Sequence, residues 1–259
     1  MTRKQNTIYV VLAYAIFWVL LIAAVGIMSA MPEAAGVVLP LVQVVGTWAP
    51  TIALLILFKK LYPGSTVKGF FKNAFKERLN FKMLAVATVA YGLITVATVS
   101  IAAFDKNVSF FSLLSFSFGG LIITLFSGAM GEEAGWRTHL QQSMEKKHSL
   151  LKTCLIVGII WAFWHAPTWM DAIVANMAWY IPLDILSKIS NAFIIGICYN
   201  RCRNLFVPMW MHFVMNILSN GMQGFIVEYI VWYIVLLVFV AACYIIWYSR
   251  SSKKVTAQE

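Results

Sequence analysis

Charged residues are scarce in this sequence. Only 12% of its 259 residues are Asp, Glu, Lys or Arg, whereas 61% are hydrophobic. Soluble domains are roughly one quarter charged and about half apolar, so this composition excludes an ordinary soluble protein. A chain segment in lipid must pair all of its own backbone polar groups, which leaves helices or closed barrels. Because the apolar runs are long and do not alternate with polar residues, the sequence predicts an all-α polytopic membrane protein.

Acidic residues and cysteines are also few. The chain has 10 Asp and Glu against 20 Lys and Arg, which gives a net charge of +10. The basic residues lie in short segments between apolar runs and do not form one soluble face, so no nucleic-acid partner is expected. The four cysteines show no C-x-x-C spacing, which predicts small core residues and no metal knuckle or redox couple. They are Cys154, Cys198, Cys202 and Cys243.

Eight apolar segments are long enough, or nearly so, to cross a bilayer, which takes about 20 residues. They cover residues 8–30, 37–58, 83–104, 116–141, 151–168, 178–200, 205–220 and 227–248. Pro32, Pro40 and Pro50 interrupt the second segment, which we expect to begin as an interfacial or re-entrant piece. With the N-terminus in the cytoplasm, 17 of the 20 basic residues fall in cytoplasmic segments, in accord with the positive-inside rule. The prediction is a single membrane domain over residues 1–259, with about eight spans and both termini in the cytoplasm.

The longest polar connection, residues 59–82, has two interpretations. Phenylalanines at 70, 71, 75 and 81 are interleaved with its basic residues, which is typical of an amphipathic helix on an anionic leaflet. A basic loop that only sets the topology is the equally open alternative.

Ionisable and amide side chains inside the predicted spans are concentrated in the second half of the chain, and charged ones cost roughly 2.5 to 3.5 kcal/mol each there. They include Glu132, Glu133, Arg137, His165, His212 and Asn216. Glu133 and Arg137 are four residues apart, so they share a helix face and can neutralise each other. Glu132 is left without a partner, which makes it the better candidate for a general base, and Glu133 the better structural residue.

Depth in the membrane predicts that three of these helices meet. Glu132 lies 14 residues before the basic loop at 146–152 and His165 lies 13 residues after it, so both are roughly 20 Å from that loop. His212 and Asn216 are four residues apart and therefore face the same way. The sequence predicts one buried polar site shared by the three helices.

These residues form motifs that resemble those of a known family. Residues 132–137, E-E-A-G-W-R, resemble the E-E-x-x-x-R motif of the CAAX protease and bacteriocin-processing family, also called the Abi family. Residues 161–165 resemble its F-x-x-x-H motif, with Trp161 in place of Phe, and residues 212–216 are similar to its H-x-x-x-N motif. The resemblance, which covers about residues 115–220, is to the type II CAAX prenyl endopeptidases in particular.

The resemblance implies an intramembrane endopeptidase of about eight helices, with a cavity open to the cytoplasmic side. In such an enzyme Glu132 and His165 would activate a water molecule. His212 and Asn216 would stabilise the tetrahedral oxyanion, which needs fixed donors in a dry site. Three further residues would support the site: Glu133, Arg137 and Trp161.

A metal ion is an open alternative in this mechanism. The family is often called a metalloprotease, and Glu132, His165 and His212 could form a catalytic zinc set. The H-E-x-x-H motif is absent, however, and a glutamate bound to zinc cannot also serve as the free base. We therefore favour a metal-independent glutamate mechanism, with no cofactor established and zinc as the alternative.

Two other function classes stay open. One is a non-catalytic membrane protein that binds or scaffolds a partner, such as a bacteriocin-immunity protein. The other, less favoured, is a proton-coupled transporter, because transporters often show interrupted helices in both halves and the polar residues here lie in one half. A protease of this kind would act on hydrophobic peptides, lipidated C-terminal segments or bacteriocin-like precursors, among membrane lipids. The compact chain favours a bacterial plasma membrane over an internal eukaryotic one.

Overall fold

The computed structural model describes residues 2–222 and 224–256, and every regular element in these ranges is a helix. The longer helices are α1 (Arg3–Ala30), α2 (Ala35–Thr47), α3 (Ala49–Ile56), α6 (Phe81–Lys106), α10 (Leu150–Trp164), α12 (Tyr180–Cys202), α13 (Phe206–Gly221) and α14 (Ile226–Thr256). Shorter elements join them: η1 (Pro32–Ala34), α4 (Phe58–Leu61), α5 (Val67–Ala74), η2 (Phe110–Leu113), α7 (Phe118–Thr124), η3 (Leu125–Ala129), α8 (Met130–Glu133), η4 (Ala134–Gln141), α9 (Gln142–Glu145), η5 (Ala166–Thr168) and α11 (Trp169–Val174).

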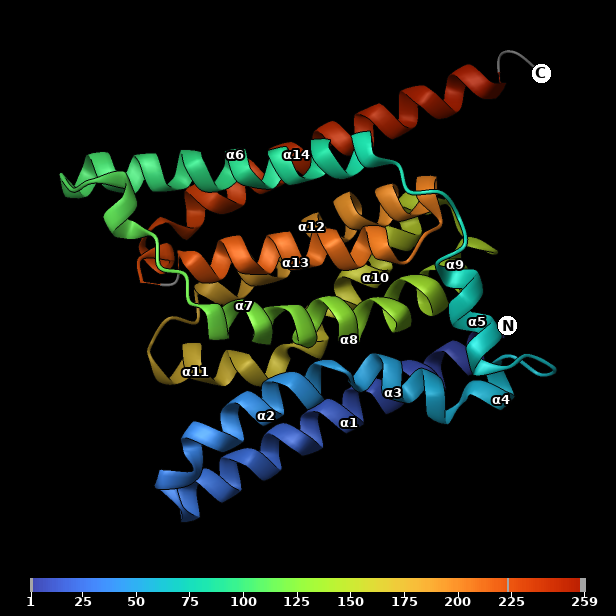
Figure 1. Ribbon diagram of the computed structural model, residues 1–259, viewed down its shortest axis with the longest axis horizontal. Coiled ribbons are helices and arrows are strands. Elements are labelled where there is room, and N and C mark those ends of the chain that lie inside the picture. Colours follow the sequence, from blue (N-terminus) through green and yellow to red (C-terminus); the bar gives the residue numbers. More distant parts are fainter. Residues whose placement is uncertain (1, 223, 257–259) are drawn as a thin grey trace.

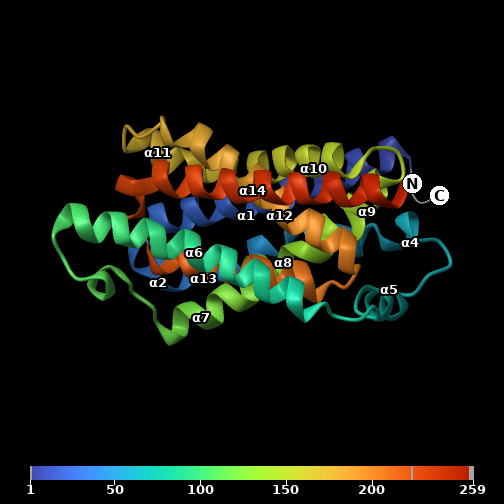
Figure 2. The same ribbon diagram turned by 90° about the horizontal axis from the view of Figure 1, so that it is seen from above.

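The helices form an elongated bundle (Figure 1). Helices α1, α2 and α3 lie along one side, α6 and α14 lie along the opposite side, and α8, α10, α12 and α13 lie between them. Helix α1 begins and α14 ends at the same end of the bundle, and α4, α5 and α9 lie near that end too (Figures 1 and 2). The helices that carry the predicted polar site are therefore the central ones.

Four helices of the described chain are long and apolar enough to cross a membrane: α1, α6, α12 and α14 over Ile226–Ser251. Two bent pairs meet the same test if each is taken as one span. Pro32–Thr47 and α3 meet at 50°, and α10 and Ala166–Val174 meet at 46°. The protein is thus an integral multi-pass membrane protein, as predicted, but length and composition support four to six spans and not eight.

Two of the predicted spans fail this test because their helices are too short or are interrupted. The segment predicted at 116–141 is interrupted near its middle, and α13 has only 16 residues. The second half of the 116–141 segment, η4, is fully buried, whereas α7 lies at the edge of the bundle (Figure 2). Where protein surrounds it, a short or broken helix can be tolerated.

Proline accounts for the bends, as the sequence predicts. Helix α2 ends at Thr47, and Pro50 lies in the first turn of α3, where its missing N–H leaves no bond unmade. Pro40 lies inside α2 without ending it. Pro167 follows the end of α10 and lies within η5.

Two glycines allow α3 to pack closely against the central helices. A Cβ on Gly131 would lie 2.8 Å from the carbonyl oxygen of Thr47, and one on Gly135 would lie 2.6 Å from Cβ of Pro50. Since Gly131 and Gly135 are four residues apart, they present one smooth face to the start of α3. This packing fixes the short helical segment between the two glycines, which contains both Glu132 and Glu133.

The connection at 59–82 contains the short helix α5, which is part of the first of its two predicted interpretations, while contact with an anionic leaflet stays a prediction. In α5, Lys68 and Lys72 are exposed, whereas the ring of Phe70 packs against the ring of Phe58, with the ring centroids 5.6 Å apart. Asn204, at the start of α13, donates to the carbonyl of Phe75 at 3.0 Å. The apolar face of α5 thus contacts protein, and the connection is fixed to the bundle.

The prediction for the cysteines is correct at three positions. Cys154, Cys198 and Cys202 are buried, whereas Cys243 is exposed. Cys243 is on α14, where its neighbour Trp247 is also exposed, because this helix lies at the edge of the bundle and turns one face outward.

Candidate active site

The first polar motif lies in a helical segment that is interrupted twice. Helix α7 is followed by a π-helix, η3, and α8 is followed by a second π-helix, η4. Ser127 and Gly128 depart from helical geometry, with ψ of −162° and φ of 8° respectively. π-Helical turns are rare in proteins, and those that occur are often found at functional sites. The sequence predicted one continuous helix over 116–141, which is wrong, and the break comes one turn before Glu132.

Glu133 links two helices through one carboxylate. Its Oε2 accepts a hydrogen bond from Nε of Arg137 at 2.9 Å, and its Oε1 accepts one from Nδ1 of His212 at 2.7 Å. Glu133 and Arg137 are fully buried, and His212 is nearly so. The predicted Glu133–Arg137 pair is therefore present, and the bond to His212, which sequence reasoning missed, joins α8 to α13.

Arg137 also faces an aromatic ring. Its Cζ lies 5.5 Å from the ring centroid of Trp161, within the range of a cation–π interaction. Its Nη1 and Nη2 are buried and have no hydrogen-bond partner among the described residues. Arg137 thus places its positive charge between Glu133 and the ring of Trp161.

Glu132 is held by two indoles. Its Oε2 accepts from Nε1 of Trp161 at 2.7 Å and from Nε1 of Trp136 at 3.2 Å, and its side chain is almost fully buried. The family resemblance had implied only a supporting role for Trp161 and gave no role to Trp136. Since Trp136 is four residues after Glu132, helical spacing could have indicated this bond.

Three polar atoms converge at Gly128. A Cβ built on Gly128 would lie 2.9 Å from Nε2 of His212 and 2.9 Å from Nδ2 of Asn216. The same point lies 3.3 Å from Oε1 of Glu132. A carboxylate oxygen and two nitrogens therefore surround one small volume that glycine leaves free of side chain. Hydrolysis at a carbonyl requires a base for the attacking water and hydrogen-bond donors for the oxyanion, all about 3 Å from the reacting atoms. The three side chains meet this requirement.

His165 connects to this volume only through Trp161 among the described contacts. It caps the C-terminus of α10, and its Nδ1 donates to the carbonyl of Trp161 at 2.9 Å. Because a carbonyl oxygen can only accept, Nδ1 carries the proton and Nε2 of the neutral ring keeps its lone pair. Trp161 thus bonds Glu132 through its indole and His165 through its backbone. The described contacts include no direct bond between His165 and Glu132, His212 or Asn216.

The zinc alternative requires Glu132, His165 and His212 to meet around one metal ion. No group of three or more His, Cys, Asp or Glu side chains within residues 2–222 and 224–256 is arranged to hold a metal ion. Glu132 and His212 each already use one polar atom, toward the two indoles and toward Glu133 respectively. The residues present do not form a three-ligand zinc set, and we assign no catalytic step to a metal.

A second polar cluster adjoins the site from α12. Asp184 accepts from Nζ of Lys188 at 2.8 Å and from Nε1 of Trp169 at 2.9 Å. These two charged residues, together with Asn216, line a cavity of about 190 Å³. The sequence analysis left this pair unassigned, although Asp184 and Lys188 are four residues apart.

Comparison with known proteins identifies the family that these residues resemble. The sequence model of a family described as type II CAAX prenyl endopeptidase Rce1-like matches residues 114–218. A CAAX prenyl protease 2 from Methanococcus maripaludis is 26% identical over 191 residues, covering 68% of this chain and 70% of that protein. The predicted resemblance to the CAAX protease family is confirmed, and the matched residues coincide with the predicted 115–220 core. Both matches are to proteins named as CAAX prenyl proteases.

Proposed function

We propose that this protein is an intramembrane endopeptidase that hydrolyses hydrophobic peptides, lipidated C-terminal segments and bacteriocin-like precursors among them, at the Gly128 site. The observation that carries the proposal is the convergence of Oε1 of Glu132, Nε2 of His212 and Nδ2 of Asn216 at one point. A water molecule and the carbonyl of a peptide bond would share this space.

Glu132 acts as the general base in this mechanism. Its Oε2 is held by the two indoles, so Oε1 is the oxygen that takes a proton from water. The resulting hydroxide attacks the peptide carbonyl carbon, and Glu132 then gives the proton to the leaving amine, which restores the carboxylate. Nε2 of His165, with its free lone pair, orients the attacking water.

Asn216 and His212 stabilise the oxyanion. The amide nitrogen of Asn216 donates directly, whereas His212 donates from Nε2 when its ring carries both protons. The Glu133 carboxylate holds Nδ1 of His212 in a hydrogen bond, and the same carboxylate is paired with Arg137. Glu133 and Arg137 thus act through His212 and do not touch the substrate.

We place the end of the bundle where α1 begins in the cytoplasm. The basic residues gathered in the segments at this end favour that side by the positive-inside rule. A bacterial plasma membrane is the compartment that we propose.

The test of this function is cleavage of quenched fluorescent peptides, hydrophobic or farnesylated, by the purified protein in detergent. We expect cleavage by the native chain and its loss in Glu132→Gln. A folded native chain that cuts none of these peptides would favour the binding or immunity function instead.

A further inference from the structure

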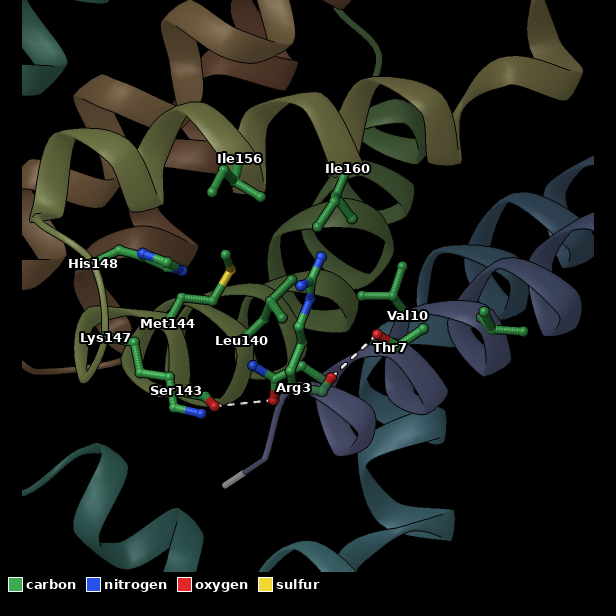
Figure 3. Close-up of a pocket in the computed structure, with 12 residues that line it drawn as sticks. Arg3, Thr7, Val10, Leu140, Ser143, Met144, Lys147, His148, Ile156 and Ile160 are labelled. Atoms are coloured by element: carbon green, nitrogen blue, oxygen red, sulfur yellow. Dashed lines mark hydrogen bonds between the residues drawn. The ribbon is translucent and has the colours of Figure 1, made fainter.

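A separate cavity opens between α1, α9 and α10. Its volume is about 670 Å³, and none of the proposed catalytic residues lines it. Figure 3 shows its lining residues. They come from the first turns of α1, from η4 and α9 and the turn that follows, and from the C-terminal half of α10. This cavity has no part in the proposed hydrolysis.

Hydrogen bonds tie the walls of this cavity to one another. Tyr14 on α1 donates to the carbonyl of Ile160 on α10, which closes one end of the cavity. At the other end, Oγ of Ser143 donates to Oδ1 of Asn6 at 3.0 Å, which ties the α9 segment to α1 (Figure 3). Since α1 is bonded to both other walls, the space between them is preformed.

Three basic side chains line the cavity. Arg3 reaches into the cavity from α1, His148 faces it from the turn before α10, and Lys147 belongs to the same turn (Figure 3). Among the described residues, no acidic side chain lines the cavity, and none forms an ion pair with these three. Two fixed cations and an imidazole without an acidic partner favour an anionic ligand.

The lining is apolar along the rest of its length. Val10, Ile156 and Ile160 form this wall, and Val11 beside them is 61% exposed on a helix that is apolar enough to span the membrane. The apolar part of the cavity therefore continues into the surface that faces lipid chains. A free phosphate would leave this wall uncovered, whereas a phospholipid would cover it with an acyl chain.

We propose that this cavity binds one anionic phospholipid. Its phosphate lies between Arg3, Lys147 and His148, and one acyl chain lies along Val10 and the α10 wall. A zwitterionic lipid fits less well, because its own cation would face the protein cations. The site is distinct from α5, whose Lys68 and Lys72 are exposed and line neither this cavity nor the one beside α5.

The experiment is native mass spectrometry of the full-length purified chain, titrated with phosphatidylglycerol or phosphatidylcholine. We expect one phosphatidylglycerol to bind at least ten times more tightly than phosphatidylcholine. The double variant Arg3→Gln/Lys147→Gln should bind it roughly 30-fold more weakly, because two charged contacts with the headgroup are lost. The matched control, Lys68→Gln/Lys72→Gln on α5, removes the same charge and should leave the affinity within twofold.

A second variant tests the apolar wall without changing any charge. Ile156→Trp fills the acyl-chain space, so we expect it to weaken phosphatidylglycerol binding at least tenfold while peptide cleavage continues. Equal weakening by the control pair would show a diffuse surface charge and overturn the proposal. It would also be overturned if glycerol 1-phosphate alone bound as tightly as phosphatidylglycerol, or if a hydrophobic peptide displaced the lipid.

Discussion

His212 donates a hydrogen bond from Nδ1 to Oε1 of Glu133 at 2.7 Å, and both side chains are buried. This bond sets the ring of His212 so that Nε2 points toward Gly128. The other oxygen of Glu133 is bonded to Arg137, so one carboxylate positions a histidine and balances an arginine. Glu133 is therefore a positioning residue, and Glu132 is the residue with a free oxygen at the site.

Removing the Glu133 charge should destabilise the protein. Glu133→Gln leaves Arg137 buried without a full counter-charge, and breaking a buried pair in this way costs about 3 to 5 kcal/mol. The measurement is the midpoint of thermal unfolding in detergent. Glu77→Gln is the matched control, since the exposed Lys76–Glu77 pair should contribute less than about 1 kcal/mol. Equal midpoints for the two variants would show that the Glu133 pair does not stabilise the fold.

A methyl group at Gly128 should block the reaction. In Gly128→Ala the new Cβ occupies the point that Glu132, His212 and Asn216 surround, so substrate carbonyl and water are excluded. We expect the rate of cleavage to fall at least 100-fold. The control is Gly119→Ala on α7, where a Cβ meets nothing within 4 Å and alanine favours the helix by roughly 0.5 to 1 kcal/mol. Normal cleavage by folded Gly128→Ala would place the chemistry elsewhere.

Loss of the Asn216 amide should affect the transition state more than substrate binding. For Asn216→Ala we expect kcat to fall about 100- to 1,000-fold, the usual effect of removing one oxyanion donor, with KM changed little. Ser219→Ala is a suitable control, because the Ser219 hydroxyl donates to the carbonyl of Asn216 within α13. A rise in KM with kcat unchanged would instead assign Asn216 to substrate binding.

Metal removal should leave the activity intact. The described side chains do not form a three-ligand metal site, and the glutamate mechanism needs none. We expect the rate of peptide cleavage to be unchanged, within twofold, after dialysis against 1,10-phenanthroline. Loss of cleavage that returns on addition of zinc would contradict the glutamate mechanism and support the zinc alternative.

Sequence reasoning predicted the residues of the candidate site but not its geometry. The pairing of Glu133 with Arg137 follows from their spacing, and the bend before α3 follows from Pro50. The break at Ser127 and Gly128 could not be predicted, because the apolar pattern continues through it. Counting 1.5 Å per residue assumes straight helices, so the depths of Glu132 and His165 could not show how the broken helix places Glu132.

Long-range hydrogen bonds were the other missing information. The bond from His212 to Glu133 and the bond from Trp161 to Glu132 join residues 79 and 29 positions apart. A single sequence gives the chemistry of such side chains but not which of them meet across helices. Helix length and composition support four to six spans, fewer than the eight predicted, because α13 is short and the 116–141 segment is interrupted.

The most direct test of the proposed hydrolysis is the rate of peptide cleavage by Glu132→Gln. The comparison is the native chain and Glu145→Gln, whose carboxylate bonds Gln141, Asn200 and Arg203 away from the site. Loss of the general base should lower kcat about 100- to 10,000-fold in Glu132→Gln, while Glu145→Gln stays within tenfold of the native chain. Native-like cleavage by Glu132→Gln would contradict the assignment of Glu132 as the base and, with it, the proposed mechanism.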